Sequence, residues 1–114
     1  MKVTRFTDAP SYPIPPDHRA MHCLRLQGHE AGTTQSLWMG VSHILPGGGT
    51  DLLPSPLEKH YVVLAGAVEI ATADGAETLG PWDSVSIAPG EARRLTNRSN
   101  VPATILLAMP LPPK

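Results

Sequence analysis

The chain has 114 residues and a formal net charge of −1, with 41% hydrophobic and 17% charged residues. This length predicts a single soluble domain with a core of its own. The longest basic run is Arg93-Arg94, which excludes a nucleic-acid interface that depends on a basic stripe to neutralise phosphates. The apolar runs are too short to span a bilayer, so no membrane association is expected.

The N-terminal residues and the cysteine content indicate a cellular compartment. The first sixteen residues lack the uninterrupted apolar segment of a secretory signal. Cys23 is the only cysteine, so no internal disulfide can form, as is usual in a reducing compartment. We therefore expect a cytoplasmic protein.

Residues 1–19 are expected to form an extended N-terminal arm, because prolines at four positions interrupt any helix or central strand. The arm is expected either to be loose or to dock on a partner subunit. Residues 20–114 are expected to form the folded domain. The prolines of the arm are Pro10, Pro13, Pro15 and Pro16.

Beyond the arm, short apolar segments alternate with turn residues. This pattern, with 13 prolines and 10 glycines spread along the chain, predicts an all-β sandwich or barrel without long helices. We expect Gly66 to bend one long segment, and Asp74-Gly75 to form a hairpin turn. The second strand in the list below, 35–45, is expected to stop at Pro46. In chain order the predicted strands are 21–26, 35–45, 60–72 (up to the hairpin), 84–88, 93–97 and 103–109.

A first spaced motif lies between Gly47 and Gly66. The chain resembles the cupin superfamily here, whose first motif runs Gly, five residues, His-x-His, three residues, Glu, six residues, Gly. The frame fits without a gap, with Leu53, Ser55 and Lys59 at the three ligand positions. The resemblance implies an antiparallel double-stranded β-helix, or jelly-roll barrel, with the site inside.

The second cupin motif runs Gly, five residues, Pro-x-Gly, two residues, His, three residues, Asn. Its frame fits from Trp82 to Asn97 and retains Gly90. Trp82 replaces the first glycine, the proline has moved to Pro89, and Arg93 replaces the histidine. The resemblance covers about residues 37–109.

In cupins the two motifs supply three histidines and one glutamate to a metal ion. In this chain Leu53 has no donor atom, Ser55 is a weak neutral ligand, and Lys59 and Arg93 are cations. We therefore expect no metal and no cofactor at these positions. A different metal site, built from His43 with His22 or His60, has no supporting spacing in the sequence but stays open.

Lys59 and Arg93 carry the chemistry expected in place of the metal. Lys59, Tyr61 and Val63 should share one strand face, and Arg93, Leu95 and Asn97 another. The resemblance implies that both faces point into the barrel. Two cations in a partly dry interior need anions. The anion comes either from the protein or from a ligand; the candidates in the protein are Glu58, Glu91 and Asp51.

Three functions remain open from the sequence. The first is a metal-free cupin whose Lys59, Arg93 and Asn97 bind a small organic acid or a phosphorylated ligand. The second is a metal-independent isomerase, epimerase or lyase that uses His43, Lys59 or Tyr61 for proton transfer. The third is a structural protein with a plugged barrel. A homodimer is expected because small cupins usually dimerise and the outer face carries apolar Val62 and Leu64.

Overall fold

The computed structural model describes residues 1–113, which form nine β-strands and two short 3-10 helices. No helix in that range is long and apolar enough to cross a bilayer. The 3-10 helices are η1 (Phe6–Asp8) and η2 (His29–Ala31). The strands are β1 (Ser11–Tyr12), β2 (His18–Gln27), β3 (Leu37–Thr50), β4 (Lys59–Ala65), β5 (Val68–Thr72), β6 (Gly75–Leu79), β7 (Ser84–Ile87), β8 (Arg94–Thr96) and β9 (Ala103–Pro110).

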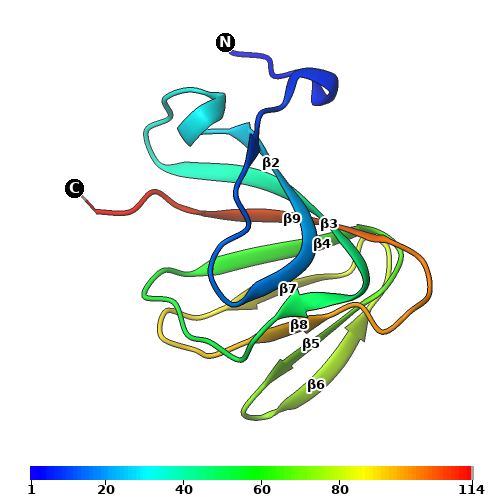
Figure 1. Cartoon of the computed structure of the whole chain (residues 1–114). Coiled ribbons are helices and arrows are strands. Elements are labelled where there is room, and N and C mark those ends of the chain that lie inside the picture. Colours follow the sequence, from blue (N-terminus) through cyan, green and yellow to red (C-terminus); the bar gives the residue numbers. More distant parts are fainter. Residues whose placement is uncertain (114) are drawn as a thin grey trace.

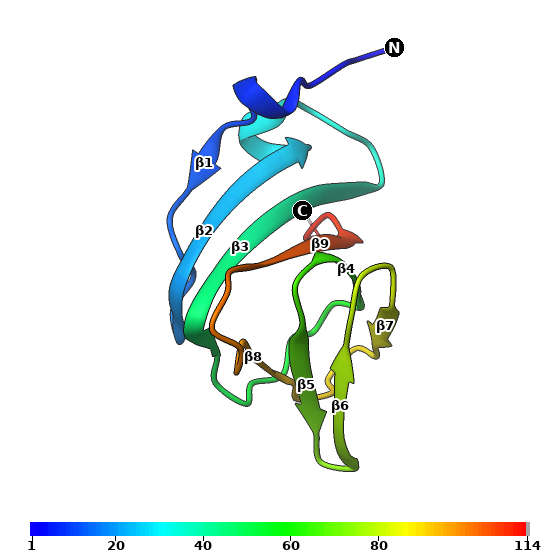
Figure 2. The same cartoon turned by 90° about the vertical axis from the view of Figure 1, so that its right-hand side faces the viewer.

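The strands form one antiparallel sheet that curves into a nearly closed barrel. Its order is β6-β5-β8-β3-β9-β4-β7, and β2 adds to β3 while β1 adds to β2. The N-terminal arm lies at one end of the barrel and the β5–β6 hairpin projects at the other (Figures 1 and 2). The predicted all-β cupin architecture is thus confirmed.

Alternation of side chains along the strands decides which residues enter the barrel. In β4, Tyr61 and Val63 are buried, while His60 is exposed and Val62 is half-buried. Near β8, Arg93, Leu95 and Asn97 are all buried. Both predicted inward faces are confirmed. The apolar cluster that fills the barrel is Met21, Cys23, Ile44, Tyr61, Val63, Val68, Ile70, Ile87, Leu95, Ala103 and Ile105.

Strand β3 is longer than the sequence predicted, because it continues through Pro46 to Thr50. Pro46 is tolerated since the register with β2 shifts at this point and leaves Pro46 without a ladder partner, so its missing N–H costs no hydrogen bond. Gly49 then pairs with both Arg19 of β2 and Thr96 of β8. This glycine-rich end of β3 therefore joins the two halves of the barrel.

Both predicted turns occur, one of them shifted by a residue. Gly66 lies between β4 and β5 with a φ of 74°, as expected for a bend. Thr72 pairs with Gly75, so the two-residue hairpin loop is Ala73-Asp74 and not Asp74-Gly75.

The N-terminal arm docks on its own barrel. Ser11 and Tyr12 of β1 pair with Leu24 and Cys23 of β2, and the Arg25 amide donates to the Pro10 carbonyl at 2.8 Å. Residue 18 already belongs to β2. The arm therefore forms part of the barrel wall near the site described below.

Gly49→Ala should destabilise the protein by about 1–3 kcal/mol more than Gly75→Ala does. Both glycines have φ above 140°, so both variants carry backbone strain. A Cβ at Gly49 would collide with the Leu95 backbone carbonyl, whereas one at Gly75 would meet no atom within 4 Å. Urea unfolding of the two variants measures the difference. Equal losses of stability would show that close packing at the end of β3 is not the constraint.

Candidate ligand-binding site

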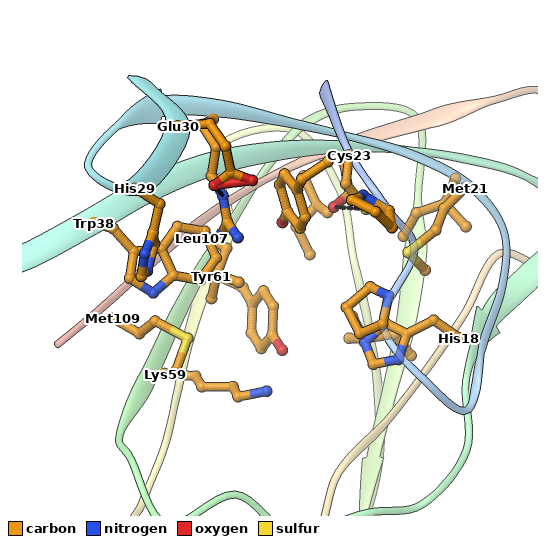
Figure 3. A pocket seen from close by; sticks show the side chains of 18 of the residues that line it. His18, Met21, Cys23, His29, Glu30, Trp38, Lys59, Tyr61, Leu107 and Met109 are labelled. Atoms are coloured by element: carbon orange, nitrogen blue, oxygen red, sulfur yellow. Dashed lines mark hydrogen bonds and ion pairs between the residues drawn. The ribbon is translucent and has the colours of Figure 1, made fainter. Parts of the chain in front are cut away.

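A cavity of about 430 Å³ opens into the barrel (Figure 3). Its walls come from β1, β2, β3, β4, β9 and the segment around β8, together with η2 and the arm. It is therefore built from both ends of the chain and both cupin motifs. This volume lies within the ordinary range for small-molecule sites, and a barrel plugged by its own side chains would not have such a cavity.

One end of the cavity is cationic. Lys59 and Arg93 both line it, together with Tyr61, His18 and Leu95. Lys59 extends into the open space beside the Tyr61 hydroxyl, and the His18 ring lies across from them (Figure 3). The two cations predicted to replace the metal ligands are thus brought to one place.

Arg93 is almost completely buried, with 3% of its surface exposed. Its Nε donates to the Tyr61 hydroxyl at 3.0 Å, and its Nη1 donates to the Thr50 hydroxyl at 3.3 Å. Within residues 1–113 no hydrogen bond uses Nη2, and no carboxylate lies within ion-pair distance of the guanidinium. A buried guanidinium with only neutral partners is uncommon, because its charge stays uncompensated.

The three carboxylates expected as internal partners of the cations are engaged elsewhere. Asp51 accepts from Arg19 at 3.0 Å on the surface. Glu58 contacts His60 at 2.6 Å. Glu91 accepts from the Ala88 amide at 3.0 Å. None of these three carboxylates therefore neutralises Lys59 or Arg93.

Burial and mutual repulsion shift the pKa values of the groups at the cationic end. Burial, and then the charge of Arg93, lower the pKa of Lys59 from 10.5 to about 8. Burial, with smaller contributions from Arg93 and Lys59, also lowers the pKa of His18. Burial raises the pKa of Tyr61. Near neutral pH this end thus holds a permanent cation, a partly deprotonated amine and a protonated phenol.

The other end of the cavity is aromatic and carries an ion pair. The Arg25 guanidinium carbon lies 3.5 Å from the Tyr12 ring centre and 4.4 Å from the Trp38 ring centre. Arg25 Nε also donates to Glu30 at 3.0 Å. Hydrogen bonding by its own backbone and by Arg25 lowers the pKa of Glu30, so this carboxylate is ionised at neutral pH.

His43 does not face the cavity, and the prediction that it points inward is wrong. Its neighbours Ser42 and Ile44 line the cavity. His43 lies on the outer face, where its Nδ1 is 3.0 Å from the Thr104 hydroxyl and its ring contacts Phe6 edge-on. The apolar neighbours Met39 and Val41 suggested an inward face, but Val41 is buried on the outer side of β3, where Phe6 of the arm packs on His43.

Asn97 is fully buried but is also not a ligand-binding residue. Its amide donates to the carbonyls of Ile44 and Val101 at 2.9 and 2.8 Å, and its side-chain oxygen accepts from Ser99. These bonds use its polar atoms and fix the turn before β9. Asn97 therefore holds the barrel together, and its assignment as a ligand contact is corrected.

The site does not fit the metal ion that the cupin fold implies. Leu53 and Ser55 do not line the cavity, and Lys59 and Arg93 offer charge of the wrong sign. Nowhere in the described chain do three or more His, Cys, Asp or Glu side chains gather as a metal would require. His22 and His43 are neighbours on the outer face, whereas His60 pairs with Glu58.

The sequence-based prediction did not identify several residues that line the cavity. Strand alternation alone indicates Arg25, because it follows Met21 and Cys23 on the inward face of β2. In β3 the same rule gives Trp38 only once Ser42 and Ile44, rather than His43, are known to face inward. His18, Tyr12 and Glu30 had no such signal, because they lie in segments that were expected to be an arm or a loop.

Replacing Lys59 with Met should raise the melting temperature by a few degrees at pH 7. The folded protein disfavours the charged amine, so Lys59 lowers the free energy of unfolding below about pH 8. This cost falls as pH rises from about 8 towards 10.5, because the folded amine is already neutral there while the unfolded chain still binds the proton. The advantage of Lys59→Met should thus shrink across that window. Thermal melts from about pH 7, below the folded pKa of about 8, up to the ordinary value of 10.5 test this, with Lys2→Met on the exposed arm as control. An advantage of Lys59→Met that does not change with pH would contradict the depressed pKa.

Similarity to known proteins agrees with this fold. The chain is 43% identical over 113 residues to a protein of Mycobacterium tuberculosis named beta-D-galactosidase Rv1717, covering 98% of this chain and 96% of that one. No family model matches the chain.

Solved structures show the same barrel. The polyketide cyclase RemF from Streptomyces resistomycificus superposes with a TM-score of 0.85 at 20% identity, covering 96% of this chain and 79% of that one. A cupin-superfamily sugar phosphate isomerase from Silicibacter pomeroyi gives 0.81 at 19% identity, covering 99% and 77%. An RmlC-like cupin from Shewanella frigidimarina gives 0.78 at 10% identity, covering 96% and 90%. The chain therefore has the cupin fold and belongs to the same family as its mycobacterial relative.

Proposed function

We propose that this protein binds a small acidic ligand of about sugar size, such as a sugar acid or a sugar phosphate, in the barrel cavity. One observation carries the proposal: Lys59 and Arg93 line the same end of the cavity without a carboxylate partner in residues 1–113. The ligand supplies the missing negative charge.

The energetics favour an anion at this end. Arg93 is held in place by Tyr61 and Thr50, so its free Nη2 is oriented before a ligand arrives. Little conformational entropy is then lost on binding. A guanidinium matches the two oxygens of a carboxylate or phosphate, and hydrogen bonds between charged groups are about twice as strong as neutral ones. Lys59 adds a second positive charge at the same end.

The remainder of the cavity suits the body of a small polar molecule. Trp38 and Tyr12 supply ring faces and edges, and Ser42 adds a hydroxyl. The Arg25–Glu30 pair offers further polar groups at the aromatic end. A cavity with a few fixed polar groups among apolar walls is the usual form of a small-molecule site. The name of the mycobacterial relative also points to carbohydrate ligands.

A panel of matched sugars tests the proposal. Galacturonate and galactose 6-phosphate should bind more tightly than galactose, as measured by calorimetry. Arg93→Met should weaken acid binding by about 10- to 100-fold, since a charged hydrogen bond contributes about 1.5–3 kcal/mol. Lys59→Met, at a less buried position, is the second variant, and Arg98→Met on the surface is the matched control. Acids that bind no better than galactose, or binding that both variants leave unchanged, would refute the proposal.

Hydrolysis of a β-galactoside is the second candidate function, and it rests on the 43% identity to a protein of that name. The cavity offers one carboxylate among its described lining residues, Glu30. Most glycosidases use two carboxylates, one of them protonated. Glu30 is ionised and held by Arg25, so it suits charge stabilisation or a base role rather than that of the acid.

If the chain hydrolyses a chromogenic β-D-galactoside, Glu30→Gln should lower kcat at least about tenfold, a loss typical of a missing acid–base group. Glu77→Gln on the exposed face of β6 is the control. A hydrolysis rate that does not depend on Glu30 would place the reaction outside the proposed chemistry. No hydrolysis together with tight acid binding would leave the binding function alone.

The other functions expected from the sequence are weaker. Of the proposed isomerase or lyase groups, Lys59 and Tyr61 line the cavity, whereas His43 does not. The open cavity disagrees with a plugged structural barrel. The homodimer stays a prediction.

A further inference from the structure

We propose that Lys59 is a nucleophile that forms an imine with the carbonyl carbon of a 2-oxo acid whose carboxylate is held by Arg93. The inference rests on the proposed anion site and deepens it, since it specifies the class of acid and the bond that forms.

The placement of Lys59 favours a nucleophile over an ion-pair partner. Its side chain reaches from β4 into the cavity and ends in open space (Figure 3). In the part of the chain that the structure describes, no carboxylate pairs with the amine and no hydrogen bond holds it. The lone pair of the neutral amine is therefore free to attack a bound carbonyl.

The surroundings of Lys59 keep part of the amine neutral. The charged or titratable groups at this end are Arg93, His18 and Tyr61. Burial and the charge of Arg93 lower the pKa of Lys59 to about 8, and no carboxylate of residues 1–113 pairs with Lys59 or Arg93 to oppose them. About a quarter of the amine is then neutral at pH 7.5, against about one part in a thousand for an ordinary lysine. Desolvation and a neighbouring cation are the usual means by which proteins activate a lysine.

Arg93 selects the acid that presents its carbonyl to Lys59. In a 2-oxo acid the carbonyl carbon is bonded directly to the carboxylate carbon. A carboxylate on Arg93 therefore holds the carbonyl at the cationic end, where the Lys59 amine also lies. Holding the two reactants together converts the addition into an effectively intramolecular step.

Tyr61 is placed to donate a hydrogen bond to the substrate oxygen. Its hydroxyl oxygen accepts from Arg93 Nε at 3.0 Å, which leaves its own hydrogen free. Burial keeps the phenol protonated. Its hydroxyl points into the space beside Lys59 (Figure 3). Tyr61 thus supplies a hydrogen bond to the oxygen as negative charge develops there.

The reaction balances without an oxidant or reductant. The Lys59 nitrogen lone pair forms a bond to the carbonyl carbon, and the C=O π pair moves to the oxygen. A proton passes from the amine to that oxygen and gives a carbinolamine. The hydroxyl then leaves as water with the second amine proton, and the C=N bond remains.

Reductive trapping tests the inference. The protein is incubated with pyruvate and cyanoborohydride at pH 7.5, and the intact mass and tryptic peptides are measured. The chain has three lysines, Lys2, Lys59 and Lys114, so the modified position is found directly. Among the three lysines the reduced adduct should appear on Lys59, at a rate at least about tenfold above that of Lys2, given its larger neutral fraction.

Two variants and one probe separate this inference from the anion site. Lys59→Arg keeps the charge but lacks the amine, so trapping should disappear while galacturonate still binds. Arg93→Met should slow trapping by pyruvate more than trapping by acetone, which lacks the carboxylate. Adducts spread equally over Lys2 and Lys59, or no adduct in a protein that binds acids normally, would overturn the imine and leave the proposed function standing. If the unmodified protein bound no acid at all, both the imine and the proposed anion site would be overturned.

Discussion

The Arg93 guanidinium is buried among neutral partners, and much of the site follows from how the barrel accommodates it. Tyr61 and Thr50 each accept one of its hydrogen bonds, and the Thr50 hydroxyl also accepts from the Leu95 amide. Thr50 ends β3, Tyr61 lies in β4 and Leu95 in β8. One side chain thus ties three strands at the cationic end of the cavity. Since none of these partners is charged, the barrel holds a fixed positive charge that can be compensated from the cavity.

The residues that replace two of the metal ligands also bring the positive charge into the barrel. A metal-binding cupin places a cation in the barrel and surrounds it with neutral or anionic donors. In this chain the protein supplies the cations, Lys59 and Arg93, at two of the ligand positions. Leu53 stays beside Arg93 through reciprocal backbone hydrogen bonds, so the local backbone pairing survives while the side-chain chemistry is inverted. The same barrel that would bind an anion through a metal can therefore bind one directly.

The two ends of the cavity have opposite character because different parts of the chain build them. The motif segments provide Lys59, Tyr61 and Arg93 at the cationic end, where burial and the charge of Arg93 lower the pKa of Lys59. At the aromatic end Arg25 of β2 is neutralised by Glu30 of η2 and packed against Tyr12 of the arm and Trp38 of β3. A cation with a partner and two cations without one thus coexist in a single cavity. For the proposed acidic ligand this asymmetry predicts one orientation, with its acid group towards Arg93.

The sequence by itself determined the β-barrel, the inward faces of β4 and β8, and the replacement of the metal ligands. Turn residues, strand alternation and motif spacing are local properties, so they can be read along the chain. It misplaced His43, because the arm packs on the outer face of β3 through Phe6 and apolar neighbours then no longer indicate the inside. It left the counter-anion open and missed Tyr12, His18 and Glu30. Only the tertiary structure decided these points, because they depend on distances between segments that are far apart in the chain. Asp51, Glu58 and Glu91 have other partners. The arm forms part of the cavity wall.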